Sequence, residues 1–370
     1  MILPYNFHRL LTDEVGIVLP FSNRKDRKRV LLLTQKGEIA CAQIYPFLLY
    51  QRDLIRNYAV EVRELPLRLF LEGKHRYRTR IDAVCMQTPF TLTPAQLESL
   101  IGRVKSAWPK AGIAYFDWFA PADLRYAEVL NPHILAYVKK QIFRDFKEYD
   151  RPLIGDTNMT DYYAGRFGID LPETKFSIPP EFQQKIVLGS GFEYSPAIVR
   201  NLNREPNFGQ RPIDLHARVE AKGVHWYEKM RQEASTQAAK LSGRFRVSYS
   251  GRVSRRHYFE ELANSKLCFS PFGYGEVCWR DFEAMSTGSL LLKPDMSHLR
   301  LVSDFFRPYE TYVPLSWDFS DLEEKVAHYV RHDSERESIA RNAFEFLRER
   351  YRQKKFLQEI VPLWSRLCVY

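Results

Sequence analysis

The chain has 370 residues, of which 45% are hydrophobic and 14% aromatic, and its formal net charge is +10. This composition excludes a disordered chain and allows one large or two medium packed domains. The positive charge favours an anionic partner, such as a nucleotide phosphate, a nucleic acid or an acidic membrane surface.

The five cysteines are scattered, and no two have metal-ligand spacing, which favours reduced thiols. Residues 1–20 do not combine a basic start with a clean apolar run. No stretch reaches the roughly 18–20 apolar residues that span a bilayer. We therefore expect a cytoplasmic protein that, if it works on membrane material, docks on the inner face.

Short apolar runs alternate with amphipathic stretches through the first half of the chain. Arg29–Thr34 is typical of a buried strand in a parallel sheet. Thr93, Pro94 and Gln96 supply an N-cap, a first-turn proline and a capping-box partner, which predict a helix to about Ala107. In this half we predict strands over 29–34, 60–65, 81–86, 112–116 and 134–138, and helices over 43–57 and 94–107.

Residues 141–185 break this rhythm and contain a Pro179–Pro180 pair, so we interpret them as a crossing between two domains. The alternation restarts at 185–190, and strands that alternate with helices imply βαβ units. In this half we predict strands over 185–190, 213–219, 245–250, 267–270, 289–293 and 311–314, and helices over 223–242, 256–265, 278–287, 319–331 and 334–352.

Charged residues are concentrated in Ser270–Pro294, which follows the end of a predicted strand. Ligands bind at this end of the strands in open α/β sheets, and the following helix N-terminus favours phosphate. Arg280 and Glu283 lie three residues apart and share a helix face. The guanidinium can hold a diphosphate, and the carboxylate can accept hydrogen bonds from ribose hydroxyls. The alternative is structural, with both groups capping or pairing within the fold.

The run Glu283–Gly288, followed by Ser289–Pro294, resembles the EAMACG–PVV signature of nucleotide-sugar glycosyltransferases with the GT-B fold. The Ser270–Gly273 loop resembles the exostosin-like branch. The resemblance implies an α/β fold of two Rossmann-like domains facing a cleft. It implies an acceptor domain over 1–180, a donor domain over 181–335 and C-terminal helices over 336–370 that pack back toward the first domain.

In such enzymes the carboxylate that matches Glu283 binds the donor ribose. Retaining families carry a second glutamate eight residues earlier, where this sequence has Gly275 followed by Glu276. Inversion and retention therefore both stay open.

A second basic group, Gly251–His257, follows a predicted strand and includes Ser254 as an N-cap. We assign Arg252 to the donor phosphates, with Arg255 behind it; a solvated charge run is the alternative. Ser190 and Gly191 end another strand, where a plain turn is equally consistent. The predicted donor-binding residues are Lys139, Ser190, Gly191, Arg252, Tyr274, Gly275, Glu276, Arg280 and Glu283.

The first half should then supply a base for the acceptor hydroxyl. Asp117 ends a predicted strand among aromatic residues that could stack on sugars and raise its pKa by desolvation. Asp156 and Asp161 are alternatives, and a structural role for Asp117 is a further one. The resemblance implies metal-independent transfer, with the leaving-group charge met by arginines and helix dipoles. We expect no metal, and no cofactor besides the nucleotide-sugar co-substrate.

Three functions compete. We favour a glycosyltransferase that moves a sugar from a nucleotide-sugar donor to a glycan or lipid-linked acceptor, in polysaccharide or lipopolysaccharide assembly at an acidic membrane surface. A basic nucleic-acid-binding protein is the second possibility, but no recognised motif supports it, and we expect no nucleic-acid partner. A non-catalytic scaffold with the same fold is the third.

Overall fold

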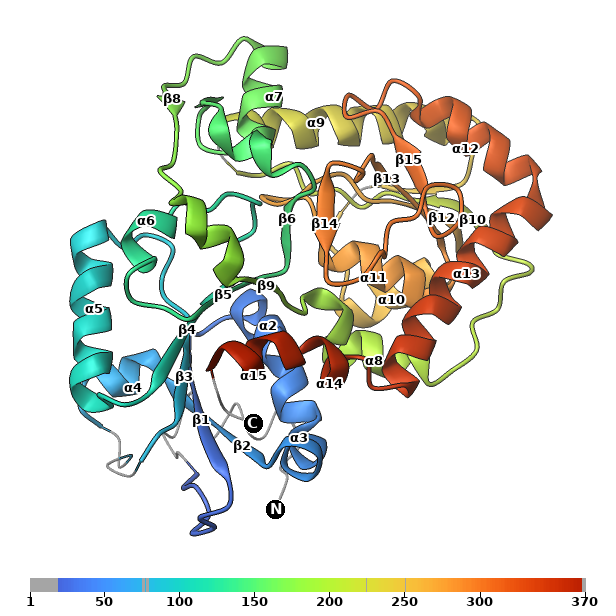
Figure 1. The fold of residues 1–370 in the computed structure, drawn as a ribbon. Helices are drawn as coiled ribbons and strands as arrows, with labels where there is room; N and C mark the ends of the chain where they lie inside the picture. Colours follow the sequence, from blue (N-terminus) through green and yellow to red (C-terminus); the bar gives the residue numbers. More distant parts are fainter. Residues whose placement is uncertain (1–18, 75–76, 78–79, 224, 250, 368–370) are drawn as a thin grey trace.

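The computed structural model describes residues 19–367, except 75–76, 78–79, 224 and 250. Residues 1–18, on which the targeting prediction largely rests, lie outside the described residues. Two α/β domains lie side by side, the first at lower left and the second at upper right in Figure 1. Among the described residues, no helix combines the length and the apolar character needed to cross a membrane.

The first domain is built on a six-stranded parallel sheet with the order β2-β1-β3-β4-β5-β9. Val30–Leu33 in β1 are fully buried, and their side chains alternate between two separate cores on the two faces of the sheet. Both faces are therefore covered by helices. The strands are β1 (Lys28–Thr34), β2 (Val60–Pro66), β3 (Ala83–Met86), β4 (Gly112–Asp117), β5 (Ala136–Lys139) and β9 (Ile186–Leu188).

The helices of this domain follow the predicted order, except that one predicted helix is divided into two. The helix predicted over 43–57 is two helices, because the chain leaves helical geometry at Tyr50. The predicted capping box is confirmed, since the Gln96 N–H donates to Thr93 Oγ1 at 3.3 Å and the Thr93 N–H donates to Gln96 Oε1 at 2.9 Å. The helices are α2 (Glu38–Leu49), α3 (Gln51–Tyr58), α4 (Leu67–Leu71), α5 (Pro94–Ala107) and α6 (Ala127–Leu130).

The strand predicted over 185–190 lies in the first sheet, and the prediction that it opens the second half was wrong. β9 pairs in parallel with β5, with Ile186 beside Tyr137. A short apolar strand followed by glycine has the same pattern in either sheet, so periodicity could not assign it. The last helices, α14 (Phe356–Glu359) and α15 (Val361–Leu367), also cover this sheet and bury Trp364 completely (Figure 1).

The second domain has a five-stranded parallel sheet with the order β11-β10-β12-β13-β15. Its strands are β10 (Ile213–His216), β11 (Val247–Ser248), β12 (Ser265–Phe269), β13 (Leu290–Pro294) and β15 (Val313–Leu315). Its helices are α8 (Pro196–Leu202), α9 (His225–Lys240), α10 (Arg255–Ala263), α11 (Trp279–Thr287), α12 (Leu322–Arg331) and α13 (Asp333–Arg352). Gly288 ends α11 with a φ of 72°, a left-handed conformation that turns the chain into β13.

The crossing segment, residues 141–185, contains ordered secondary structure that connects the two domains. β6 (Gln141–Phe143) pairs antiparallel with β14 (Leu299–Leu301) of the second domain, and β7 (Leu153–Ile154) pairs with β8 (Glu173–Thr174). α7 (Asn158–Phe167) packs on α9, where the Tyr163 ring lies 5.8 Å from Trp226 at an angle of 12°. Short 3-10 turns complete the chain at 146–150, 180–185, 192–194 and 241–243.

Candidate active site

Glu283 lies in α11, the helix that follows β12 at the carboxyl edge of the second sheet. Its Oε2 accepts a hydrogen bond from the hydroxyl of Tyr258 on α10 at 2.9 Å. Burial raises the pKa of Glu283, and the Tyr258 hydrogen bond and the charges of Arg280 and Arg255 oppose that rise. One carboxylate oxygen is therefore held in place, and the other is left for a ligand.

Arg280 lies one turn before Glu283 and bridges two strand ends. Its Nη2 donates to the carbonyl of Arg218, after β10, and its Nη1 contacts the carbonyl of Phe269, in β12, at 3.5 Å. Burial lowers the pKa of Arg280, but Tyr258, Cys268 and Glu283 outweigh it and leave the pKa above its usual value. Its Nε is buried and has no hydrogen-bond partner in the described chain. The guanidinium is fixed at the sheet edge, and its contact with a diphosphate stays a prediction.

Arg218 belongs to the same group, and the sequence analysis missed it. Its Nε and Nη2 each donate to a carboxylate oxygen of Glu261 at 2.6 Å, and its Nη1 donates to the Gly251 carbonyl at 2.8 Å. The sequence placed Arg218 inside the strand predicted over 213–219, whereas that strand ends at His216 and leaves Arg218 at its carboxyl end. We call Arg218, Tyr258, Glu261, Arg280 and Glu283 the strand-end cluster.

Tyr274 and Arg252 lie on the loops that surround this cluster. The Tyr274 side chain is 49% exposed and stacks on Tyr227, with ring centroids 4.0 Å apart and an angle of 17°. Arg252 is largely exposed and lies 3.5 Å from Glu220. Both side chains are accessible to a ligand from solvent, and their roles in donor binding stay predictions.

Gly275 and Glu276 serve the domain interface. A Cβ on Gly275 would lie 2.1 Å from the Ala120 carbonyl oxygen, so only glycine fits against the first domain. Glu276 is fully buried, accepts a hydrogen bond from Gln141 of β6 and lies 3.7 Å from His298 Nε2. Burial acts to raise its pKa, but His298 lowers it below the usual value. The structure does not support Glu276 as a donor ligand, because its carboxylate is enclosed.

The carboxyl end of the first sheet contains a closed ion pair. Asp117 and Lys139 are direct partners in the β4–β5 register, and the Lys139 ammonium bonds to the Asp117 carboxylate. Asp117 also accepts hydrogen bonds from the Tyr137 hydroxyl and from the Phe119 N–H at 2.8 Å. Both charged side chains are no more than 1% exposed. This contradicts Asp117 as the base and Lys139 as a phosphate ligand.

The alternative bases are also paired. Asp156 lies 3.2 Å from Arg125, and Asp161 lies 2.9 Å from Arg151 while it accepts from the Ile154 N–H. These carboxylates brace the crossing segment, so the structure does not favour them either.

Ser190 and Gly191 lie after the end of β9 and line, with Lys140, a recess of about 10 Å³. The Lys140 ammonium donates to the Phe119 carbonyl at 3.2 Å, and burial lowers its pKa to about 8. Ser190 Oγ is buried without a hydrogen-bond partner in the described chain. The predicted pair therefore belongs to the first domain, and Lys140 replaces Lys139 as the cation at this edge.

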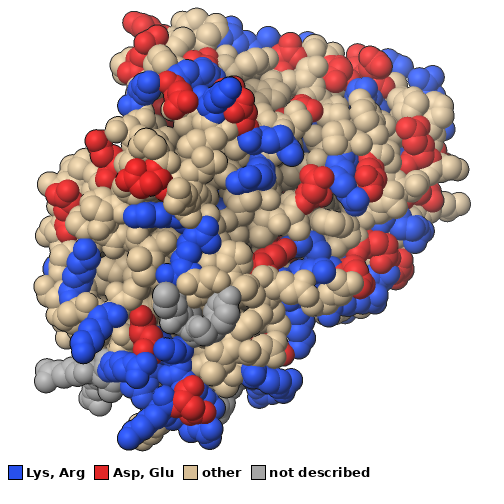
Figure 2. Space-filling model, viewed as in Figure 1, with Lys and Arg blue, Asp and Glu red and all other residues tan. Residues whose placement is uncertain are grey.

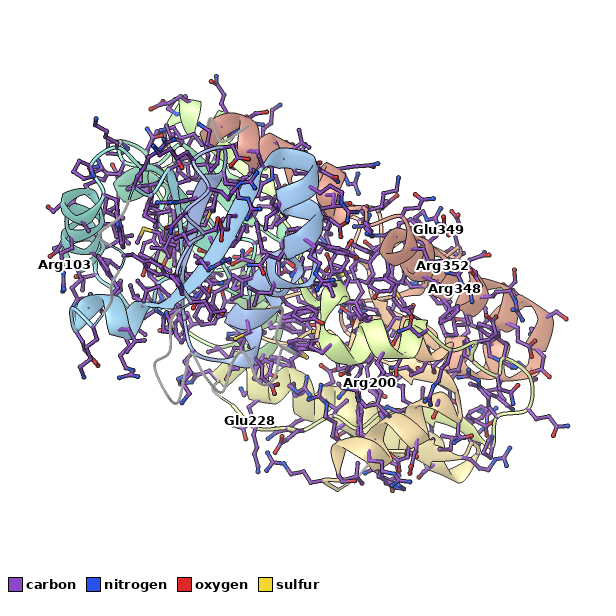
Figure 3. All side chains as sticks on the ribbon, turned by 90° about the horizontal axis from the view of Figure 1, so that it is seen from below. Arg103, Arg200, Glu228, Arg348, Glu349 and Arg352 are labelled. Atoms are coloured by element: carbon purple, nitrogen blue, oxygen red, sulfur yellow. The ribbon has the colours of Figure 1, made fainter. Side chains whose placement is uncertain are left out.

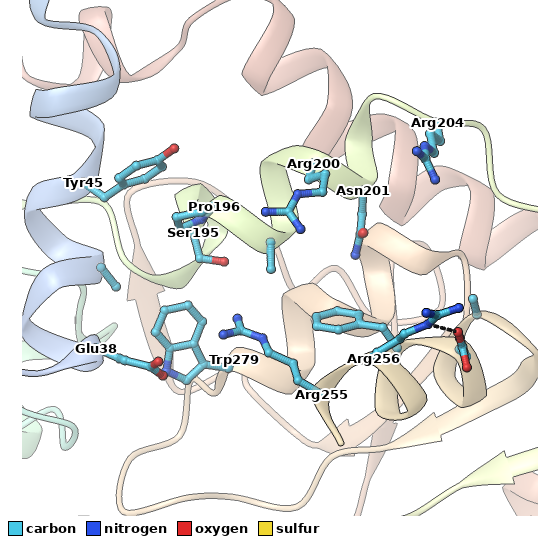
Figure 4. Close-up of a pocket in the computed structure, with 15 residues that line it drawn as sticks. Glu38, Tyr45, Ser195, Pro196, Arg200, Asn201, Arg204, Arg255, Arg256 and Trp279 are labelled. Carbon is cyan, nitrogen blue, oxygen red and sulfur yellow. Dashed lines mark hydrogen bonds and ion pairs between the residues drawn. The ribbon is translucent and has the colours of Figure 1, made fainter. Parts of the chain in front are cut away.

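A larger space, the interdomain cavity, separates α2 of the first domain from α8, α10 and the start of α11 (Figure 4). Its volume is about 680 Å³, within the range of small-molecule sites. Glu38 and Tyr45 of α2 line one side. The other lining residues include Trp279 and four exposed arginines, namely Arg200, Arg204, Arg255 and Arg256. Since Arg255 also acts on Glu283, the cavity adjoins the strand-end cluster.

Comparisons with known proteins agree with this architecture. Residues 197–361 match the family model described as "Glycosyl transferase-like". No curated protein sequence matches the chain. An alpha-glucosyltransferase in complex with UDP-glucose and abasic DNA has a similar structure, with a TM-score of 0.52 and 10% identity, over 90% of this chain and 99% of that one.

Two further structures are similar. A complex of alpha-glucosyltransferase with UDP and mismatched DNA has a TM-score of 0.50 and 9% identity, with 90% and 99% of the two chains covered. A glycosyltransferase from Rickettsia africae has a TM-score of 0.46 and 10% identity, at the same coverage. Residues 197–361 therefore match a glycosyl transferase-like family model, and the chain shares the two-domain GT-B fold of the alpha-glucosyltransferase structures.

Proposed function

We propose that the protein transfers a sugar from a nucleoside-diphosphate donor to a glycan or lipid-linked acceptor, in polysaccharide or lipopolysaccharide assembly. The observation that carries the proposal is Glu283, which Tyr258 orients at the carboxyl edge of the second sheet, inside the matched region. A half-buried carboxylate with one free oxygen suits the hydroxyls of a ribose.

The remaining groups suit the rest of such a donor. Arg280 and the amino end of α11 provide positive potential for the diphosphate. Tyr274, already stacked on Tyr227, offers an exposed aromatic face for a nucleobase. In the reaction, an acceptor oxygen bonds to the anomeric carbon, the bond from that carbon to the diphosphate breaks, and the hydroxyl proton is released.

The charge that develops on the leaving diphosphate is the part of the reaction that arginines and a helix N-terminus can stabilise. We therefore expect transfer to continue in excess chelator. Complete loss of activity there, with recovery on adding a divalent cation, would show that a metal takes this role.

A nucleic-acid acceptor is a second candidate, and two observations favour it. The net charge is +10, and the two structures with TM-scores of 0.50 and 0.52 are complexes that contain DNA. On the face shown in Figure 2, however, Lys and Arg gather at the lower edge but are interspersed with Asp and Glu elsewhere, and they form no continuous track across the face. Transfer to duplex DNA that weakens steeply with salt would favour this candidate over a glycan.

The decisive experiment measures nucleotide binding and transfer with a Glu283→Gln variant. We first screen UDP, GDP and ADP by thermal shift, since a ligand of the native state raises its melting temperature. Losing a charge-assisted hydrogen bond should weaken binding of the best nucleotide by about ten- to hundredfold. Glu323→Gln, an exposed carboxylate on α12, is the control and should bind like the wild type. Unchanged affinity in Glu283→Gln would refute the donor site.

A further inference from the structure

Lys140 is a buried cation that has no ion-pair partner among the described residues. Exposed cations such as Arg200, which Figure 3 shows on α8, are solvated by water and need no such partner. Lys140 is only 6% exposed, and its ammonium makes one hydrogen bond within the described chain, to the Phe119 carbonyl at 3.2 Å. The nearby Asp117 is already neutralised by Lys139. A buried ammonium with N–H groups left over is costly to the fold, so we expect an acceptor from outside the chain to meet it.

Ser190 adds a second donor to the same recess. It is 5% exposed, and its Oγ has no hydrogen-bond partner in the part of the chain that the structure describes. Ser190 and Lys140 both line the recess of about 10 Å³ after β9. The other polar side chains of this lining already have partners, namely Gln43, Asp117 and Trp118. The recess therefore has donors without acceptors, and its volume admits a single oxygen atom with lone pairs.

The recess lies at the boundary with the second domain, beside the start of α11. The Lys140 ammonium lies 5.0 Å from the centre of the Phe192 ring. That ring stacks on Trp279, the first residue of α11, with centroids 4.5 Å apart. Ala42 lines both the recess and the interdomain cavity, so the two spaces adjoin. The amino end of α11, to which we assign the donor diphosphate, therefore lies across the domain boundary from Lys140.

We propose that Lys140 and Ser190 bind one phosphoryl oxygen of the leaving diphosphate, so that the first domain supplies a catalytic cation. This inference rests on the proposed function, which assigns the diphosphate to the amino end of α11. When the bond from the anomeric carbon to the diphosphate breaks, its electron pair stays on the diphosphate oxygen. The Lys140 ammonium stabilises the added negative charge and keeps its proton. The leaving-group site is then complete only when both domains contribute to it.

The neighbours of Lys140 set the pH range in which it is charged. Burial lowers the pKa of Lys140 to about 8, and the Lys139 charge acts in the same direction. Asp117 at the end of β4, together with Glu276 and Cys278 just before α11, acts to raise that pKa. The side chain is therefore protonated at about pH 7 and loses its proton as the pH rises through about 8.

The test is calorimetric titration of the full chain with UDP, UMP and inorganic pyrophosphate; GDP with GMP or ADP with AMP replaces the uridine pair if the screen selects that base. Lys140→Met removes the charge at similar volume, so UDP affinity should fall by about tenfold or more. UMP lacks the second phosphate and should bind within about threefold of the wild type. Ser190→Ala should weaken UDP by about two- to tenfold. Lys110→Met, an exposed lysine before the start of β4, is the matched control and should bind both nucleotides like the wild type.

Two further measurements separate this role from a structural one. The UDP preference, which is the ratio of UDP affinity to UMP affinity, should fall in the wild type between about pH 7.5 and 9.5, where both nucleotides keep their full charge. In Lys140→Met it should stay constant over this range. Lys140→Met should also resist urea as well as the wild type or better, since it removes a buried charge that the chain does not neutralise.

The outcomes separate this proposal from the donor assignment. Loss of the UDP preference in Lys140→Met supports the proposal, provided that Glu283→Gln keeps the preference while it binds both nucleotides more weakly. A wild-type preference in Lys140→Met overturns it, because the recess then holds only water. Equal loss of UDP and UMP in Lys140→Met, with lower stability, overturns it as well, because Lys140 is then structural. If the wild type binds no nucleotide, the proposed function fails. Pyrophosphate binding that Lys140→Met abolishes then still supports the oxygen site, and absence of pyrophosphate binding overturns it.

Discussion

The carboxyl ends of the two parallel sheets both contain charged side chains, but the two domains use them differently. In the first domain, Asp117 and Lys139 neutralise each other and are closed off by Tyr137. In the second domain, Glu283 shares one oxygen with Tyr258 and makes no ion pair within the described residues. The second domain also has a closed ion pair, between Asp281 and Lys293, but on the same helix Glu283 remains an acid with one oxygen left for a ligand.

The comparison shows that the position of a charged side chain in the fold makes it a candidate for ligand binding. Its hydrogen-bond partners within the chain then decide whether it can bind a ligand. A charge whose hydrogen-bonding capacity is filled by its own chain stabilises the fold. A charge held by a single neutral hydroxyl stays available to a ligand. Three changes would break or sharpen this contrast.

The largest effect should come from disrupting the Asp117–Lys139 ion pair, and it should appear in the unfolding free energy. Asp117→Asn leaves the Lys139 ammonium buried without its counter-charge, which should cost about 3–5 kcal/mol of unfolding free energy. Urea denaturation of the variant and the wild type measures it. The double variant Asp117→Leu with Lys139→Met, which removes both charges, should recover part of the loss. Wild-type stability in Asp117→Asn, together with a large fall in transfer rate, would restore Asp117 as the base.

A smaller effect should come from Tyr258→Phe, which removes the hydroxyl that orients Glu283. The loss of one neutral donor should weaken UDP binding by about two- to tenfold. The Tyr258 hydrogen bond lowers the pKa of Glu283, so its removal raises that pKa further above the usual value. The ribose hydroxyls need the ionised carboxylate. As the pH is lowered, the UDP affinity of Tyr258→Phe should therefore begin to fall at a higher pH than that of the wild type.

UDP titrations of Tyr258→Phe across a pH series measure this shift. Tyr309→Phe, an exposed tyrosine in the second domain, is the control and should follow the wild type. Coinciding pH profiles for the wild type and Tyr258→Phe would show that Tyr258 does not tune the acid.

The smallest effect should come from Arg252→Gln. This side chain is 86% exposed and faces Glu220 at 3.5 Å, so water and salt screen it. We expect UDP affinity to fall by less than about threefold, with the difference vanishing at high salt. A loss as large as that of Glu283→Gln would place the diphosphate on the 251–254 loop instead of at Arg280.

Local signals in the sequence were sufficient for much of the fold. The Thr93 capping box and the buried run in β1 depend on neighbouring residues only, and both are confirmed. The sheet to which β9 belongs depends on which distant strand it meets, and no local pattern encodes that. The predicted 43–57 helix is divided at Tyr50, whose ring packs against the distant Tyr194 and Phe356.

The residues of the candidate site also divide into those that local sequence identifies and those that depend on contacts between distant segments. Glu283 and Arg280 could be found because they lie one turn apart in a helix after a strand. The Asp117–Lys139 pair could not, since it arises from the register between β4 and β5. Arg200 and Arg255 line one cavity only because α8 and α10 both face it, so their common location is a property of the assembled chain.

The return of α14 and α15 to the first sheet has a consequence for how the protein is made. Trp364 fills the core beneath β4 and β5, yet the ribosome adds it after the entire second domain has been synthesised. Domains of most chains condense in the order in which they emerge. Here the earlier domain has to wait with part of one sheet face uncovered, and a nascent chain stalled before residue 356 should need a chaperone to shield that part.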